Sequence, residues 1–142
     1  MIIMNNQTNP KYRSNHNHRN NNPKKSQWTL NKNDEIILFK KTYGYQWIYS
    51  NNKNKPIGFG IEKNNNNQIK LLGHSAKMYG QIRELKIAKF VENQNNWHGY
   101  PADYHTHKAD TPPEEILKKW VFGGFIDKKI MCKILKGQKC NL

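Results

Sequence analysis

The clearest pattern of hydrophobic and polar positions lies in the segment 57–62, where three large apolar residues alternate with two glycines and a glutamate. Alternation with a period of two predicts a β-strand with one buried face. A second apolar stretch, 69–72, follows four consecutive asparagines, and asparagine is favoured in turns. The two segments together predict a β-hairpin.

Three further segments after Trp28 carry strand-forming residues. Residues 36–39 are aliphatic and aromatic, and residues 45–49 are aromatic and β-branched. Residues 82–91 fit both a strand and a helix, and a strand is favoured because an asparagine-rich turn cluster follows them. These segments predict a small, mainly antiparallel sheet.

The period changes in the last third of the chain, where apolar residues recur every three to four positions. Thr111 can act as the N-cap of a first helix, Pro112 suits its first turn, and Glu114 can complete a capping box. Gly123 and Gly124 are typical of a helix end.

A second helix is predicted to begin after Asp127, a favoured N-cap residue, and to end at Gly137. Two such helices with a short connection predict a helical hairpin over about 112–137. The fold class predicted from all these segments is α+β, a small mainly antiparallel sheet followed by a C-terminal helical hairpin.

Charge divides the chain into two parts. The 142 residues carry 24 Lys and Arg against 10 Asp and Glu, a net charge of +14. Residues 1–26 contain eight asparagines, five basic residues and no acid, so they predict a disordered, basic N-terminal tail. Residues 27–142 still have a net charge of +9 and are expected to form a single basic domain.

The hydrophobicity of the chain bears on location. No apolar run approaches the roughly 20 residues that span a bilayer, and the opening residues do not resemble a signal peptide. A cytoplasmic protein without membrane contact is therefore expected. The two cysteines, Cys132 and Cys140, are too few for a zinc site of their own or for a disulfide scaffold.

The strong positive charge favours RNA or DNA as a partner, because Lys and Arg neutralise phosphates and aromatic rings stack on unpaired bases. An excess of Asn, Lys and Ile from a biased genome is an alternative source of the charge. The alternating aromatic residues at 43–49 form a stacking platform if exposed and part of the core if buried. The candidate nucleic-acid-binding residues are Lys40, Lys41, Tyr45, Trp47, Tyr49, Lys53, Lys55, Trp97, Tyr100, Lys128 and Lys129.

The segment 97–110 interleaves aromatic residues with His and Asp, which is typical of a functional loop. A loop that only packs over the edge of the core is the alternative. Metal-independent ribonucleases use a His base and basic groups on the phosphate. The candidate catalytic residues for such a toxin-like ribonuclease are His98, His105, His107 and Lys108.

The same segment contains His105-x-His107, which with His98, Asp103 or Asp110 could hold a metal ion. This spacing is similar to the His-x-His of the JAMM/MPN metalloproteases. That resemblance implies zinc on His105, His107 and Asp110 and a base at Glu62. Lys108 stands where those proteins have proline, and their Ser-x-x-Asp is missing.

The sequence supports four functional hypotheses, ranked as follows, and leaves open whether the protein is an enzyme. Nucleic-acid binding is the leading hypothesis, a metal-independent ribonuclease is the second and a metal-dependent hydrolase is the third. A protein partner bound through the helical hairpin is the fourth. We expect no cofactor and do not favour a metal. Convergence of His98, Asp103, His105 and His107 in one cleft would favour an enzyme, and dispersal would favour a binder.

Overall fold

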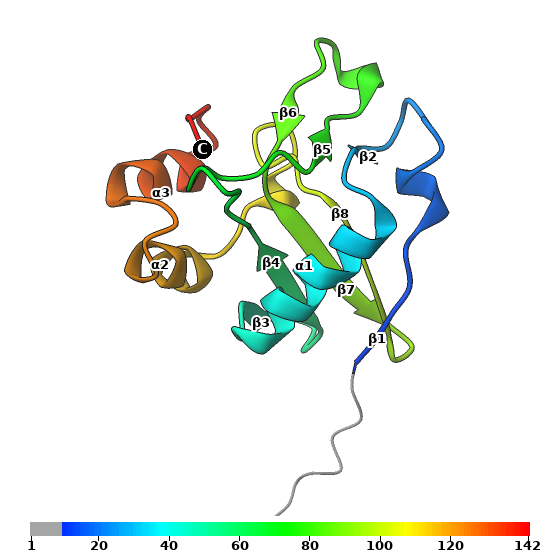
Figure 1. Cartoon of the computed structure of the whole chain (residues 1–142), viewed down its shortest axis with the longest axis horizontal. Helices are drawn as coiled ribbons and strands as arrows, with labels where there is room; N and C mark the ends of the chain where they lie inside the picture. The colour runs from blue at the N-terminus through cyan, green and yellow to red at the C-terminus, as the bar shows by residue number, and fades with distance from the viewer. Residues whose placement is uncertain (1–9) are drawn as a thin grey trace, which may run out of the picture.

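A computed structural model of the protein describes residues 10–142 (Figure 1). The fold class is α+β, as predicted, with two β-sheets and a C-terminal pair of helices. The α-helices are α1 (Lys32–Gly44), α2 (Glu114–Phe122) and α3 (Lys128–Leu135). The strands are β1 (Lys11–Tyr12), β2 (Gln27–Trp28), β3 (Ile48–Ser50), β4 (Pro56–Gly60), β5 (Gly73–His74), β6 (Glu84–Leu85), β7 (Ala88–Asn93) and β8 (Asn96–Pro101). Short 3-10 helices are η2 (His16–His18), η3 (Lys77–Tyr79) and η4 (Lys108–Asp110).

The larger sheet has five strands in the order β1-β8-β7-β4-β3. Its pairs are antiparallel except β1 with β8, which are parallel and place Lys11 opposite Asn96. A two-residue turn joins β7 to β8, and its residues Gln94 and Asn95 have φ of 51° and 69°. Asparagine tolerates this left-handed conformation, so the predicted turn cluster ends β7. The smaller sheet has the order β2-β5-β6.

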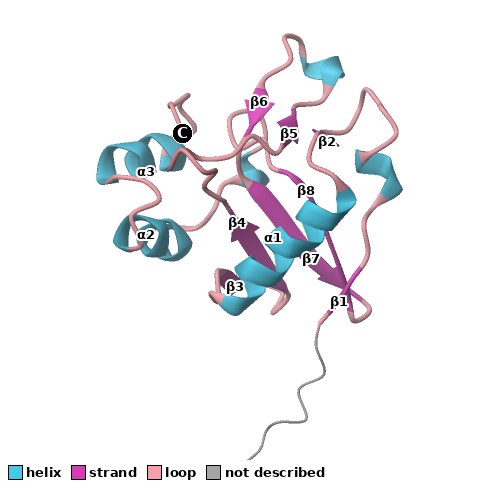
Figure 2. Ribbon diagram, viewed as in Figure 1, coloured by secondary structure: helices cyan, strands magenta, loops and turns pink. Residues whose placement is uncertain are grey.

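Figure 2 shows α1 crossing one face of the larger sheet, with the α2–α3 pair beside the sheet. Leu38 and Phe39 of α1 pack with Phe90 and Trp97 on one face. On the other face Phe59 belongs to a core cluster that includes residues of α2 and α3. The sheet therefore lies between two hydrophobic cores.

The glycines of β4 allow α1 to approach the sheet closely. A Cβ on Gly60 would lie 2.1 Å from Oγ1 of Thr42, and one on Gly58 would lie 3.1 Å from Cγ2 of the same threonine. The predicted alternation of β4 is present, but its glycine face is covered by α1 and is not exposed to solvent.

The prediction of a strand at 36–39 is wrong, because these residues lie in α1. Asn31 caps this helix through a hydrogen bond from the Asp34 amide at 2.8 Å. The buried positions Glu35, Leu38, Phe39 and Thr42 follow the helical period. Two of them are polar, so the apolar stripe that identifies a helix from sequence is incomplete.

Three other predicted elements need correction. Of residues 45–49, only the last two are in a strand, β3. The chain does reverse at the four asparagines. Within residues 10–142, one isolated bridge, Lys63 with Ile69, and two backbone hydrogen bonds of 2.7 Å join the two arms, but no strand forms at 69–72. The partners of β4 are instead β3 and β7. The segment 97–110 is not wholly a loop, since it begins in β8.

The helical hairpin is present, with one change at its start. The side chain of Asp127 caps α3, accepting a hydrogen bond from the Ile130 amide at 2.8 Å. Gly124 and Gly137 follow the two helices with φ of 81° and 71°. Thr111 does not cap α2, whose N-cap is Pro113. A residue that precedes proline is disfavoured in the helical conformation. Thr111 precedes Pro112, and Pro112 precedes Pro113, so neither residue joins the helix, which begins at Glu114.

The N-terminal tail predicted for residues 1–26 is corrected over residues 10–26, which belong to the folded domain. Tyr12 stacks on Phe39 with 4.8 Å between ring centroids. Arg19 forms an ion pair of 2.7 Å with the fully buried Glu35, and the Tyr12 hydroxyl donates a hydrogen bond to the same carboxylate. Residues 10–26 have no aliphatic side chains, and polar contacts together with the Tyr12 ring attach them to α1. The remaining part of the predicted tail, 1–9, lies outside the described residues.

Candidate functional site

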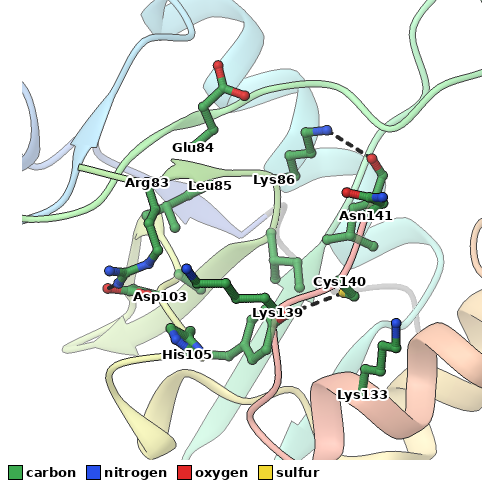
Figure 3. Close-up of a pocket in the computed structure, with 14 residues that line it drawn as sticks. Arg83, Glu84, Leu85, Lys86, Asp103, His105, Lys133, Lys139, Cys140 and Asn141 are labelled. Atoms are coloured by element: carbon green, nitrogen blue, oxygen red, sulfur yellow. Dashed lines mark hydrogen bonds and ion pairs between the residues drawn. The ribbon is translucent and has the colours of Figure 1, made fainter. Parts of the chain in front are cut away.

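A hollow of about 490 Å³ lies between the β6 region, the segment after β8 and the chain that follows α3 (Figure 3). The basic side chains that line it are Arg83, Lys86, His105, Lys133 and Lys139, and we call this feature the basic hollow. Glu84 and Asp103 also line it. Its four Lys and Arg side chains therefore outnumber its two acidic side chains.

Arg83 is held at the wall of the basic hollow by groups from two other segments. Its Nη2 lies 2.5 Å from Oδ2 of Asp103 and also donates a hydrogen bond to the Thr106 hydroxyl. Its backbone amide donates to the Ser75 hydroxyl at 2.8 Å. Within residues 10–142, Nε and Nη1 of Arg83 donate no hydrogen bond. A guanidinium has five N–H donors, so donors remain for an anion.

The segment after α3 is tied to the segment after β8. Tyr104 donates from its hydroxyl to the Gln138 carbonyl at 2.7 Å, and Cys140 Sγ lies 3.3 Å from the same hydroxyl oxygen. His105 Nδ1 lies 2.8 Å from the Gly137 carbonyl oxygen. Gly137 is left-handed, and the chain turns there toward Tyr104. The contacts fix one wall of the basic hollow.

Asp103 stands between the basic hollow and a second hollow of about 370 Å³. Asp103 is buried, with 3% of the residue exposed. Its Oδ2 pairs with Arg83, whereas Oδ1 has no hydrogen-bond partner among the described residues. One buried acceptor at the boundary of the two hollows is therefore left without a donor among residues 10–142.

The second hollow is lined by both charged and aromatic groups. Lys89, which is 8% exposed, donates from Nζ to the Ala109 carbonyl at 2.8 Å and lies 3.6 Å from the Asp110 carboxylate. Tyr100 donates from its hydroxyl to the same carboxylate at 3.1 Å. Burial first, and the nearby Asp110 second, raise the pKa of Tyr100. These contacts satisfy Lys89, Tyr100 and Asp110 with one another, and we assign them a structural role.

The four predicted catalytic residues are not brought together. His105 lines the basic hollow, and His107 lines the second hollow. His98 is half-buried on β8, outside the lining of both hollows, and burial lowers its pKa. Lys108 is exposed at the start of η4. The dispersal is the arrangement that we associated with a binding protein.

The described residues do not contain the metal-ligand cluster that the sequence suggested. Within residues 10–142, no three His, Cys, Asp or Glu side chains are grouped closely enough to hold a metal ion. His105, His107 and Asp110 are therefore not such a group. Glu62, the base implied by the metalloprotease resemblance, instead pairs with Lys41 at 2.5 Å.

The predicted nucleic-acid-binding residues are spread over the molecule and do not line the basic hollow. Trp47 and Trp97 are core residues with 4% and 6% exposure. Of the predicted stacking platform at 43–49, Trp47 is buried, Tyr43 and Tyr49 are half-buried and Tyr45 is exposed, so its rings do not form one exposed face. Tyr45 is 60% exposed and stacks on Trp47. The rest lie on α1 (Lys40, Lys41), on β3 and the turn after it (Tyr49, Lys53, Lys55), on β8 (Tyr100) and on the first turn of α3 (Lys128, Lys129).

Sequence reasoning missed the residues that form the basic hollow, namely Arg83, Lys86, Lys133 and Lys139. They come from segments about 50 positions apart, and no motif links them. The only local signal is the spacing of Lys133, Lys136 and Lys139, which adds positive charge at the end of α3.

Ion pairs neutralise few of the basic side chains. The described residues form five ion pairs, which involve five of the 24 Lys and Arg side chains. Nineteen Lys and Arg side chains remain outside these pairs.

Comparison with known proteins found no matching family model, no significantly similar curated protein and no significantly similar solved structure. None of the helices in residues 10–142 has the length and hydrophobicity needed to cross a membrane.

Proposed function

We propose that the protein binds single-stranded RNA or DNA, with the basic hollow as the main contact site. The observation that carries the proposal is the gathering of Arg83, Lys86, Lys133 and Lys139 around one hollow. Lys and Arg side chains bind the phosphate backbone and release its counterions, which supplies most of the affinity in binding without sequence preference.

The dimensions of the basic hollow favour a single strand. A volume of about 490 Å³ is in the range of small-molecule sites, so one nucleotide can enter, whereas a duplex would contact only the rim. Arg83 is held in place by Asp103 and Thr106 before any ligand binds. A fixed guanidinium loses little rotational freedom when it contacts a phosphate.

The remaining cations extend the positive field beyond the basic hollow. Lys24 and Lys25 line the second hollow, which shares Asp103 with the first. The nineteen Lys and Arg side chains outside the ion pairs of residues 10–142 would attract a polyanion from many directions and increase its association rate. Aromatic stacking contributes less than the sequence suggested, because Trp47 and Trp97 are buried.

The proposal is tested by fluorescence anisotropy with labelled single-stranded RNA and DNA at several salt concentrations. If three to five phosphates are contacted, log K should fall against log salt with a slope of roughly −2 to −3.5, at about 0.7 per phosphate. A Lys133→Ala/Lys139→Ala variant should weaken binding and reduce the slope by about 1.4.

The matched control is Lys53→Ala/Lys55→Ala, which removes the same charge from the exposed turn between β3 and β4. It should change the affinity much less than the first variant does. Equal losses in the two variants would show that the basic hollow is not the main contact site. Absence of binding at low salt to any RNA or DNA would overturn the proposed function.

A further inference from the structure

His105 is the titratable side chain in the basic hollow whose ring orientation is fixed by a backbone contact. Its Nδ1 lies 2.8 Å from the Gly137 carbonyl oxygen. A carbonyl oxygen can only accept a hydrogen bond, so Nδ1 is the donor, and in the neutral ring Nε2 then carries the lone pair. Among the described residues, Nε2 has no hydrogen-bond partner. The ring is exposed and therefore presents a proton acceptor to a ligand.

The groups around His105 suit a phosphodiester. Arg83 and Lys139 line the same hollow and lie beside His105 in the close-up view (Figure 3). Nε and Nη1 of Arg83 have no partner within residues 10–142, and Arg binds phosphate oxygens through two parallel N–H donors. Positive charge at this position would stabilise the negative charge that develops on phosphate oxygens during cleavage.

On these grounds, and resting on the proposed function, we propose that the basic hollow cleaves RNA with His105 as the general base. His105 Nε2 removes the proton from a ribose 2′-hydroxyl. The 2′-oxygen bonds to phosphorus, the bond from phosphorus to the 5′-oxygen breaks, and the leaving 5′-oxygen takes a proton from water. His105 then returns its proton to solvent. The products are a 2′,3′-cyclic phosphate and a free 5′-hydroxyl.

The position of His105 distinguishes it from the other candidate histidines. His107 lines the second hollow, away from Lys133 and Lys139. His98 lies half-buried on β8 and lines neither hollow. Only His105 of these three shares a hollow with Arg83. One histidine with a cationic wall is therefore the proposed catalytic unit, in place of several converging histidines.

The decisive variant is His105→Asn. The asparagine amide can donate to the Gly137 carbonyl as Nδ1 does, but it offers no basic nitrogen. We expect its single-turnover rate on a labelled RNA to fall by about 100-fold or more, the usual loss of a general base. Its affinity for the same RNA should change by less than about threefold. Added imidazole should restore part of the rate in a His105→Gly variant, which a merely structural role would not allow.

Two further measurements keep cleavage separate from binding. An oligonucleotide with 2′-O-methyl groups should bind to the wild-type protein and remain intact, because it lacks the 2′-hydroxyl. A His98→Asn variant should cleave RNA at the wild-type rate. RNA that binds but stays intact with the wild-type protein would overturn this inference and leave the proposed function standing. Cleavage that persists in His105→Asn would overturn the role of His105.

Discussion

At the scale of single residues, buried polar side chains with partners distant in sequence distinguish this domain. His18 is 8% exposed, its Nδ1 donates to the Ser26 carbonyl at 2.8 Å, and its ring stacks on Tyr100. Burial is the main cause that lowers the pKa of His18, and it also lowers the pKa of His98. Both rings are therefore kept neutral in the folded protein to a lower pH than in the unfolded chain.

Stability should consequently fall in mild acid. Below the ordinary histidine pKa of about 6.5, the unfolded chain binds protons that the folded state resists, so the free energy of unfolding decreases as the pH falls. We expect urea denaturation to show a lower stability at pH 5.5 than at pH 7.5. His18→Gln should reduce this difference, because one of the two resisting rings is removed.

The control for this pH effect is His16→Gln, since His16 is exposed in the same 3-10 helix. In this variant the free energy of unfolding should differ between pH 5.5 and pH 7.5 by as much as it does in the wild type. A pH dependence that His18→Gln leaves unchanged would show that burial of this ring is not its source.

At the scale of elements, α2 and α3 begin in different ways. Asp127 caps α3 with its side chain, whereas no side chain caps α2. Asp127→Ala should therefore lower the free energy of unfolding by about 1 kcal/mol, the usual loss of an N-cap. Thr111→Ala should lower it by less than about half of that value. Chemical denaturation of the two variants measures both changes, and a larger loss for Thr111→Ala would contradict the helix start at Glu114.

The elements also show how much of the fold could be predicted from sequence. The ends of α2 and α3 are fixed by local chemistry at Gly124, Asp127 and Gly137, which a short stretch of sequence contains. The helix α1 could not be recognised in this way, because its stripe includes buried Glu35, whose carboxylate is satisfied by Arg19, sixteen residues earlier. Predictions failed where a distant partner determines the local structure.

The same reasoning applies to the candidate site. His105 could be singled out because it lies in a stretch of unusual composition. Arg83, Lys133 and Lys139 could not, because each is an ordinary surface cation until the fold brings their segments together. Positive charge as a whole was visible in the sequence, but the place where it gathers is a property of the tertiary structure.

At the scale of the whole molecule, residues 10–26 are part of what holds the domain together. Glu35 is fully buried, and its carboxylate is contacted by Tyr12, Ser14 and Arg19. A chain that begins at residue 27 would lose all three partners. Removing one partner of a buried ion pair costs about 3–5 kcal/mol. We expect the thermal midpoint of the chain that begins at residue 27 to lie on the order of 10 °C or more below that of a chain that begins at residue 10.

A second substitution identifies the cause of this loss. Glu35→Gln should destabilise the chain that begins at residue 10, because the pair with Arg19 is lost. In the chain that begins at residue 27 the same substitution should stabilise, because an unpaired buried charge is removed. Thermal melts of the four proteins provide the comparison. An equal effect of Glu35→Gln in both chains would mean that the N-terminal segment does not compensate this carboxylate.

The parallel pairing of β1 with β8 has a consequence for synthesis on the ribosome. Lys11 lies opposite Asn96, so the first described strand must wait until some 85 later residues have been translated before its sheet position exists. Translation at about 5–20 residues per second makes this a delay of several seconds. During that time the basic N-terminal segment is available to the anionic ribosomal RNA around it. Four of the five basic side chains in residues 10–26 remain exposed after folding, so the closure of the sheet fixes the position of this segment without burying its charge.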